Sequence, residues 1–206
     1  MGPETTIWFS ASVLITAIFF YNLHTMSSYL IVSDIHGSLP ALQQAFRLKD
    51  KLQLERLLLL GDLLNYGPRN GLPQGLDAMG VAELLNTQAG IVTAIRGNCD
   101  SEVDQMLLRF PIMADYAQVE CGGKRLFLTH GHVYDENNWL REGSDVLCYG
   151  HTHLWKLEKC ADGRIVCNTG SVTFPKGGNP PTLAFLKGGE LSVMRLDGEV
   201  LKTLAL

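Results

Sequence analysis

The chain has 206 residues and a formal net charge of −4, from 17 lysines and arginines against 21 aspartates and glutamates. Proteins that track nucleic-acid phosphates usually carry a basic stripe, which this sequence lacks, so nucleic acid is not expected as a partner. The five cysteines are odd in number and show no C-x-x-C spacing. This pattern is typical of reduced thiols in a cytoplasmic protein and disfavours a disulfide framework or a zinc finger.

The N-terminal segment from Ile7 to Leu23 is apolar and aromatic. It is shorter than the about 20 residues that typically span a bilayer. The first basic residue is Arg47, so no positive charge sets an orientation in a membrane. We interpret residues 1–25 as an extension outside the fold and residues 26–206 as one domain. A signal anchor is the alternative, and only that alternative would make a membrane a partner. If the extension is dispensable, the protein expressed from Met26 keeps its full activity.

The first half of the domain alternates apolar runs with helical patterns. Strands are predicted at residues 29–33, 56–60 and 91–95, and helices at residues 38–55, 74–87 and 101–108. Pro40 falls in the first turn of the first helix, where its missing N–H donor does no harm. Ser101 and Asp104 have the spacing of a capping box. Strands that alternate with helices predict a sheet built from βαβ crossovers.

The second half is richer in strands. Residues 125–129 and 145–149 form two further apolar runs, and the dipeptides Asp162-Gly163, Gly188-Gly189 and Asp197-Gly198 separate short β-rich segments. Such dipeptides are typical of hairpin turns. We therefore expect a second, more antiparallel sheet packed on the first, within one α/β domain.

Residues able to bind metal follow the predicted strands, at the ends where open α/β sheets place their sites. They occur in five short segments: Asp34-Ile35-His36, Gly61-Asp62, Gly97-Asn98, His130-Gly131-His132 and Gly150-His151-Thr152-His153. An isolated histidine is more often a hydrogen-bonded structural residue. Several independent strand ends that all terminate in such residues predict a metal centre instead, because buried imidazoles and carboxylates need partners.

The order D-x-H, G-D, G-N, H and G-H-x-H resembles the calcineurin-like metallophosphoesterase superfamily. The segments 33–38, 67–70, 96–100 and 175–180 are similar to bacterial YfcE-type phosphodiesterases within it. The likeness extends from Met26 to the C-terminus, and the full ordered set is far more specific than a single D-x-H. It implies a four-layer αββα sandwich with two mixed β-sheets, with two metal ions in a cleft at the strand ends.

Carried over by position, the resemblance implies two sets of metal ligands that share Asp62. The first ion would be held by Asp34, His36, Asp62 and His153, and the second by Asp62, Asn98, His130 and His151. Mixed carboxylate, amide and imidazole donors suit Mn²⁺, Fe²⁺, Zn²⁺ or Ni²⁺. The family likeness favours two Mn²⁺ ions.

This ligand set implies a metal-dependent phosphodiesterase that hydrolyses a small phosphodiester. Two divalent ions can lower the pKa of a shared water and clamp a phosphoryl group, so we expect a metal-bridging hydroxide to attack phosphorus in line. Asp62 and Asn98 would take part as ligands. His132 could contact phosphate or act as an acid, or it could only orient a metal ligand. Arg69 could offer bidentate contacts to the substrate phosphate.

Cys99 departs from the wider superfamily, in which a histidine here helps to protonate the leaving group or to grip the phosphate. A thiol is a weak hydrogen-bond donor and a poor general acid near neutral pH. We therefore expect good leaving groups, such as those of aryl phosphodiesters, to be favoured. The alternative is that Cys99 only packs beside the site. We interpret Asp100 as a cap of the following helix. We interpret residues 176–179 as a turn at the cleft rim or at a subunit contact.

Two other kinds of function fit the same sequence. A phosphomonoesterase or a nuclease of the same fold is the nearest enzymatic alternative. A non-catalytic scaffold of the retromer-subunit type is the other, since such a protein can lose metal ligands without penalty. Here every ligand position holds an acceptable residue. The resemblance is also compatible with a homo-oligomer.

Overall fold

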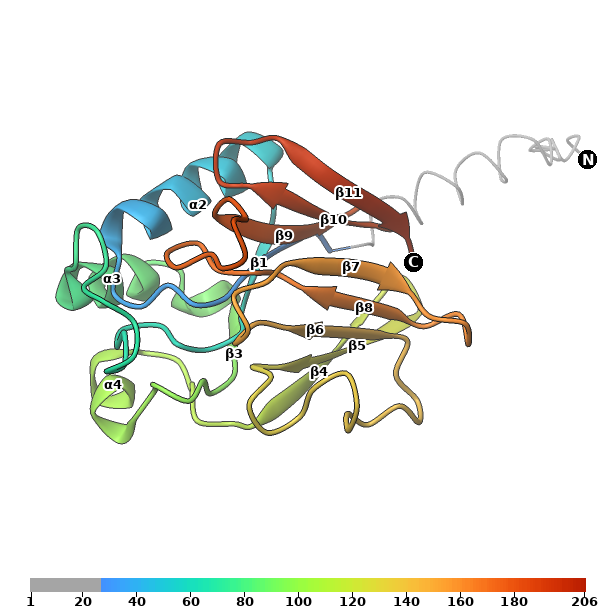
Figure 1. The fold of residues 1–206 in the computed structure, drawn as a ribbon, viewed down its shortest axis with the longest axis horizontal. Coiled ribbons are helices and arrows are strands. Elements are labelled where there is room, and N and C mark those ends of the chain that lie inside the picture. The colour runs from blue at the N-terminus through green and yellow to red at the C-terminus, as the bar shows by residue number, and fades with distance from the viewer. Residues whose placement is uncertain (1–26) are drawn as a thin grey trace, which may run out of the picture.

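The computed structural model describes residues 27–206, which form two packed β-sheets with helices on one side (Figure 1). The interpretation of residues 1–25 as an extension lies outside these residues. The six-stranded sheet has the order β11 (Val200–Ala205), β10 (Glu190–Arg195), β9 (Thr182–Lys187), β1 (Tyr29–Val32), β2 (Arg56–Leu59) and β3 (Val92–Ala94). The five-stranded sheet has the order β4 (Tyr116–Cys121), β5 (Lys124–Thr129), β6 (Val146–Tyr149), β8 (Ile165–Asn168) and β7 (Lys156–Lys159).

The helices lie where the first half of the sequence predicts them. They are α2 (Leu39–Leu52), α3 (Ala78–Asn86), the short 3₁₀ turn η1 (Ala89–Ile91) and α4 (Glu102–Leu107). The predicted start of α3 at residue 74 is four residues too early. The Asp77 side chain accepts the backbone N–H of Gly80 and so fixes the start of the helix at Ala78. Ser101 and Asp104 form the predicted capping box.

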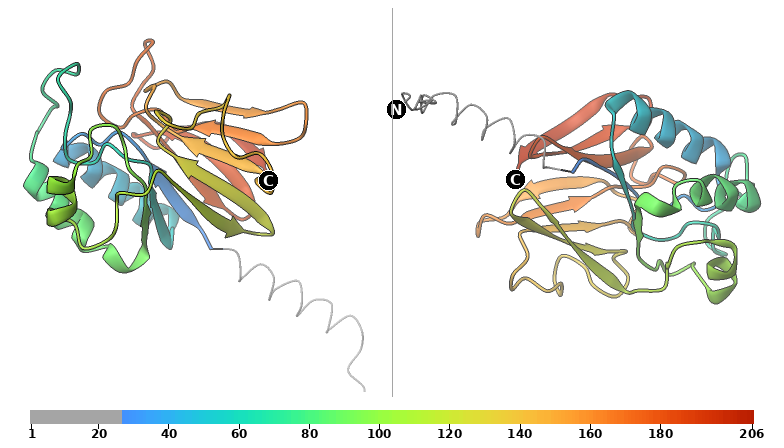
Figure 2. Two further views of the ribbon diagram at one scale, coloured as in Figure 1. Left: turned by 90° about the horizontal axis from the view of Figure 1, so that it is seen from below. Right: turned by 180° about the vertical axis from the view of Figure 1, so that it is seen from behind.

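Alternating side chains of each strand serve two different core layers. In β1, Leu30 and Val32 face α2 and α3, whereas Ile31 faces the second sheet. In β6, Cys148 faces the first sheet, whereas Leu147 faces outward. This period of two is what strands buried on both faces require. Figure 2 shows the two sheets face to face, with the helices on the outer side of the first.

The pair of packed mixed sheets is confirmed, but the C-terminal strands differ from the expected arrangement. Strands β9, β10 and β11 extend the first sheet instead of the second, because β9 pairs antiparallel with β1. Every residue of β1 is buried, so its backbone needs a partner strand on each side. The outer face of the second sheet is covered by the segment 130–145, in which Trp139 and Tyr134 pack on Phe127.

Parallel pairing brings strand ends together. Strands β1, β2 and β3 run parallel, and so do β5, β6 and β8. Their carboxyl ends therefore meet at one edge of the sandwich, which is where the candidate metal ligands follow in the sequence. In residues 27–206, no helix has the length and apolarity that crossing a membrane would require.

Candidate metal centre

The backbone turns sharply at the residues that face the centre. Asp34, His36, Asp62, His151 and His153 all have positive φ angles, between 50° and 64°. This left-handed conformation costs a residue with a side chain about 1–2 kcal/mol. Its occurrence at five candidate ligands indicates that the turns are held for function and not for stability. Small residues make the turns fit: a Cβ on Gly97 would collide with Asp62.

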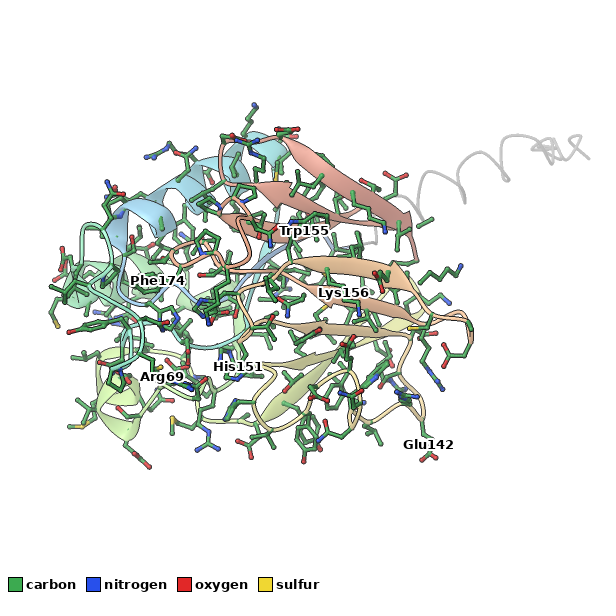
Figure 3. All side chains as sticks on the ribbon, in the orientation of Figure 1. Arg69, Glu142, His151, Trp155, Lys156 and Phe174 are labelled. Carbon is green, nitrogen blue, oxygen red and sulfur yellow. The ribbon has the colours of Figure 1, made fainter. Side chains whose placement is uncertain are left out.

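Three side chains form the first group of donors. The Nε2 atom of His153 lies 3.0 Å from Oδ1 of Asp34, and the Nε2 atom of His36 lies 3.5 Å from the same oxygen. The two Nε2 atoms are 3.4 Å apart. Adjacent ligands of an ion bound at about 2.1 Å have separations of this size. Figure 3 shows this end of the molecule, with Phe174 labelled beside it.

A second group lies next to the first. The Nε2 atom of His130 is 3.2 Å from Oδ1 of Asn98 and 3.5 Å from Oδ2 of Asp62. The His151 ring centroid is 5.1 Å from that of His130, and the backbone N–H of His151 donates to Oδ2 of Asp34. The second group therefore contains the residues that the resemblance assigns to the second ion.

Asp62 lies between the two groups. Its Oδ2 atom is 3.7 Å from Nε2 of His36 and 3.5 Å from Nε2 of His130. Its Oδ1 atom accepts the backbone N–H of Cys99 at 2.8 Å. One carboxylate oxygen thus fixes the loop that carries Asn98, and the other is directed between the two groups of donors.

Backbone carbonyls hold the histidine rings in place. The Nδ1 atoms of His36, His130 and His153 each lie 2.7 Å from a carbonyl oxygen, of Asn65, Leu60 and Phe174 respectively. Since a carbonyl only accepts, Nδ1 must carry a hydrogen, so the neutral form of each ring has its lone pair on Nε2. This is the second layer of hydrogen bonds usually found behind metal-binding histidines.

The side chains of the two groups are arranged to bind cations and not to form hydrogen bonds with one another. Nε2 of His36 faces Nε2 of His153 beside a carboxylate oxygen, so the two rings in their neutral forms would point lone pairs at each other. Among residues 27–206, Oδ1 of Asp34 is buried and finds no hydrogen-bond partner. Burial lowers the pKa of His130, but Asp62 and Asp34 outweigh it and raise that pKa to about 9. The site therefore attracts positive charge, and divalent cations bound by these donors would supply it.

Metal binding should stabilise the fold, because it relieves the repulsion between these donors. We expect chelation to lower the Tm by about 5–10 °C, the effect of losing a ligand present at about 100 times its Kd. Differential scanning calorimetry with and without Mn²⁺ measures it. His130→Ala should lose most of this response, and an identical wild-type Tm in chelator and in Mn²⁺ would contradict the prediction.

Asp100 has a different role from the predicted helix cap. Its carboxylate accepts the backbone N–H groups of Asp62, Leu63 and Gly97, at 2.8, 2.8 and 2.7 Å. Burial raises the pKa of Asp100 to about 6, against these three donors, which favour the ionised form. The side chain therefore joins the loops after β2 and β3, which carry two candidate ligands, while Asp104 caps α4.

Asp100→Asn should loosen both loops at once. The new amide nitrogen would face at least one of these backbone N–H groups. Two hydrogen-bond donors would then be in contact, and that backbone N–H would be buried without an acceptor. We expect a loss of about 3 kcal/mol in the free energy of unfolding and Mn²⁺ binding weakened about 10- to 100-fold. Urea unfolding and calorimetric titration measure these. Asp197→Asn, which removes an exposed carboxylate paired with Arg195, is the matched control. Equal effects of the two substitutions would contradict this role.

A cavity of about 330 Å³ lies over the centre. Asp62, Asn98, His151 and His153 form part of its wall. Of the residues proposed for substrate, Cys99 and Arg69 also line it. Two further lining residues, Asn70 and Thr152, have no predicted role, because they stand in loops without a recognisable ligand spacing. Lys176 also lines the cavity, in the turn interpreted as lying at the cleft rim or at a subunit contact.

His132 packs against the second group of donors and does not line this cavity. Its ring centroid lies 5.3 Å from that of His130 and 6.1 Å from that of His151. Its Nδ1 atom is buried and has no hydrogen-bond partner within the described residues. Burial and the neighbouring histidines lower the pKa of His132. The position permits contact with a group bound beside His130 and keeps the imidazole neutral.

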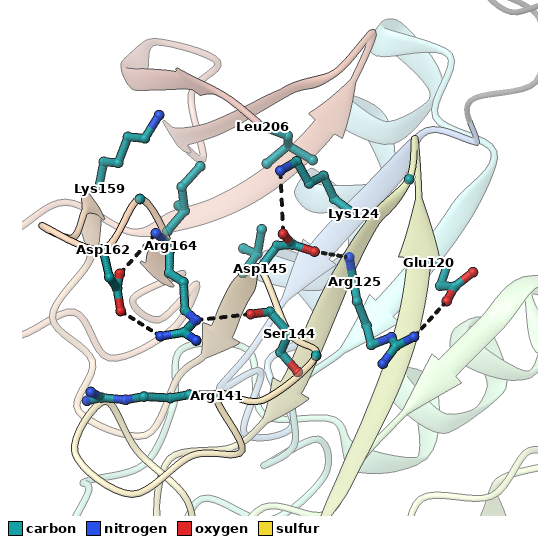
Figure 4. A pocket seen from close by; sticks show the side chains of 15 residues that line it. Glu120, Lys124, Arg125, Arg141, Ser144, Asp145, Lys159, Asp162, Arg164 and Leu206 are labelled. Carbon is teal, nitrogen blue, oxygen red and sulfur yellow. Dashed lines mark hydrogen bonds and ion pairs between the residues drawn. The ribbon is translucent and has the colours of Figure 1, made fainter.

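A larger hollow, of about 680 Å³, lies at the opposite strand ends of the second sheet (Figure 4). It has no histidine in its wall. Its carboxylates are paired: Asp145 with Lys124, Glu120 with Arg125 and Asp162 with Arg164. These pairs neutralise the acidic groups, so this hollow lacks the free donors that a metal ion needs.

The fold and the site define an α/β protein of two packed sheets with candidate metal ligands at the strand ends. The chain belongs to the calcineurin-like phosphoesterase superfamily, whose domain profile matches residues 28–189. This membership confirms the resemblance inferred from the ordered motifs.

Two groups of relatives bear on the function. Phosphodiesterase YfcE of Escherichia coli is 50% identical over 176 residues, which cover 84% of this chain and 95% of that protein. A solved structure of the E. coli YfcE phosphoesterase superimposes with a TM-score of 0.82 at 47% identity, covering 86% of this chain and 98% of the other. Vacuolar protein sorting 29 from Cryptosporidium parvum has a TM-score of 0.62 at 19% identity, covers 88% and 99% of the two chains, and shares the fold alone.

Proposed function

We propose that this protein is a metal-dependent phosphodiesterase that hydrolyses a small phosphodiester at a dinuclear centre. The observation that carries the proposal is the position of Asp62, whose Oδ2 lies within 3.7 Å of Nε2 of His36 and 3.5 Å of Nε2 of His130. Family membership and the 50% identity to phosphodiesterase YfcE support the choice of reaction.

We assign the metal ligands to two sets that share Asp62. One ion would be held by Asp34, His36, His153 and Asp62. The other would be held by Asn98, His130, His151 and Asp62. When bound, two divalent ions would supply Lewis-acid polarisation of the phosphoryl oxygens and a hydroxide for in-line attack.

The remaining groups act on the substrate. Arg69 binds and orients a substrate oxygen from the cavity wall, as a guanidinium can do with two parallel hydrogen bonds. Cys99 lies where the leaving group departs and gives it little help, because a thiol is a weak donor. His132 would contact a phosphoryl oxygen bound beside His130.

The proposal is tested by a matrix of metals and substrates. With Mn²⁺, we expect a bis-aryl phosphodiester to be hydrolysed faster than an aryl phosphomonoester, and single-stranded DNA to be cleaved least. The cavity of about 330 Å³ suits a small diester better than a polymer. Fe²⁺, Zn²⁺ and Ni²⁺ are the other metals to compare. Faster hydrolysis of the monoester or of DNA would replace the proposal by the corresponding alternative.

The scaffold alternative has less support. The shared fold with vacuolar protein sorting 29 at 19% identity does not favour it. The buried donors and their supporting hydrogen bonds are those of a site that binds metal. A protein that retains no divalent ion and hydrolyses none of these substrates with any metal would favour the scaffold.

The five cysteines form no disulfide in the described part of the chain, which supports the predicted cytoplasmic location.

A further inference from the structure

The cavity over the candidate metal centre contains two cationic side chains, Arg69 and Lys176. Asp62 is the only carboxylate among the residues that line it. Within residues 27–206, neither cation forms an ion pair. In the larger hollow of Figure 4, by contrast, Lys124, Arg125 and Arg164 are each paired with a carboxylate of the same wall.

The loop that carries Lys176 is attached to a candidate ligand. The backbone N–H of Lys176 donates to the carbonyl of His153 at 3.0 Å, and Nδ1 of His153 donates to the carbonyl of Phe174 at 2.7 Å. The backbone of Lys176 is therefore fixed relative to the His153 ring. Lys176 and His153 therefore line the same cavity from a fixed piece of backbone.

The loop that carries Arg69 is attached in the same way to His36, which belongs to the same group of donors. The carbonyl of Asn65 accepts from Nδ1 of His36 at 2.7 Å, and the Asn65 amide donates to Asp104 at 2.8 Å. Further along, the Asn70 amide closes the turn by donating to the carbonyl of Tyr66 at 2.8 Å. The two cations thus stand on two loops, each bonded to a different candidate metal ligand. Figure 3 shows Arg69 and His151 at this end of the molecule.

The charges of the centre do not need these two cations. Asp34 and Asp62 are the carboxylates of the donor groups. Two divalent ions would exceed their charge by two, and a monoanionic phosphodiester with a hydroxide would balance that excess. The charges of Arg69 and Lys176 are then left over in a cavity without another acid, and a ligand with further negative charge would complement them.

We propose that the substrate is a phosphodiester with a second anionic group, a phosphate or a carboxylate, on the arm that does not leave, and that Arg69 and Lys176 bind this group. The inference rests on the proposed function and narrows its substrate class. It makes Lys176 a residue that determines specificity, whereas the sequence alone indicated only a turn at the cleft rim or at a subunit contact.

The test compares aryl phosphodiesters that share the p-nitrophenyl leaving group. Their other arm is phenyl, 4-carboxyphenyl or 4-phosphonooxyphenyl. We expect the two anionic arms to lower the wild-type KM about 10-fold relative to phenyl with little change in kcat, since the contact is remote from the reacting bond. If only one of the two anionic substrates has a lower KM, that result identifies whether the site recognises a carboxylate or a phosphate. Lys176→Gln should remove most of this difference and leave the phenyl substrate nearly unchanged. Arg69→Gln should also remove the difference but lower kcat/KM for all three substrates, because Arg69 also contacts the phosphodiester that reacts.

Binding is also measured without turnover. We expect the chelated wild-type protein to bind 4-carboxyphenyl phenyl phosphate about 10-fold more tightly in calorimetric titration than the chelated double variant Lys176→Gln/Arg69→Gln. Added salt should weaken this binding, since both cations are exposed. Lys202→Gln, an exposed lysine on β11, is the matched control and should change nothing.

The outcomes separate the two proposals. Equal KM values for neutral and anionic arms, or equal losses on all three substrates in Lys176→Gln, would overturn this inference and leave the phosphodiesterase intact. If no diester is hydrolysed, the proposed function fails, while the calorimetric comparison still decides whether the two side chains bind an added anion.

Discussion

Asp62→Asn should lower kcat/KM for a bis-aryl phosphodiester by about 1,000-fold or more, equivalent to about 4 kcal/mol of transition-state stabilisation. Oδ2 of Asp62 is the oxygen directed between His36 and His130. The substitution keeps the size of the side chain, and the amide oxygen can still accept the N–H of Cys99. The loss would therefore report the missing charge between the two groups of donors.

The stability of the same variant provides a second measurement. In the metal-free wild type, the charge of Asp62 helps to raise the pKa of His130 to about 9, so at neutral pH the protonated ring pairs with Oδ2. The neutral amide removes this ion pair. We expect the chelated variant to be less stable in urea than the chelated wild type, and its Mn²⁺ content by mass spectrometry to fall. Asp77→Asn, at the cap of α3, is the control, because asparagine caps a helix as well as aspartate. Unchanged turnover in Asp62→Asn would end the proposal of a bridging carboxylate.

The wild-type protein should hydrolyse aryl phosphodiesters at least about 1,000-fold faster than alkyl phosphodiesters, because alkoxides leave poorly without a proton and a general acid is worth about 10²- to 10⁴-fold. Cys99 lines the cavity next to Asn98. Burial and the charges of Asp62 and Asp100 raise the pKa of its thiol to about 12. Single-turnover rates for a series of leaving groups measure the dependence.

Cys99→His tests the cause of that preference. An imidazole at this position could donate a proton, so the alkyl rate should rise about 100-fold while the aryl rate changes little. Cys160→His, at an exposed cysteine outside the cavity, should leave both rates unchanged. Similar rates for aryl and alkyl diesters in the wild-type protein would show that Cys99 only packs beside the site.

The ligand pattern could be predicted because it depends on local sequence. Each candidate ligand directly follows an apolar strand, and parallel strands deliver their carboxyl ends to one edge. Asp34 and Asp62 are predictable in this way, since β1 and β2 pair in register from Tyr29 with Arg56 to Val32 with Leu59. The capping box before α4 is equally local.

Other features depend on contacts between distant segments and left no local signal. The pairing of β9 with β1 joins residues more than one hundred positions apart, and turn dipeptides alone do not say which sheet a hairpin extends. Asp100 looked like a helix cap because capping residues are common before helices, whereas its three hydrogen bonds reach backbone groups of two other strand ends.

The sequence by itself determined the two-sheet class of fold, the family and the residues able to bind metal. Strand periodicity and short motifs depend only on residues that are close together in the sequence. Only the tertiary structure decided that Asp62 lies between two groups of imidazoles, that Asp100 joins their loops and that Lys176 shares a cavity with Arg69. Those relations are distances between side chains from separate strands and loops, and chain folding alone sets such distances.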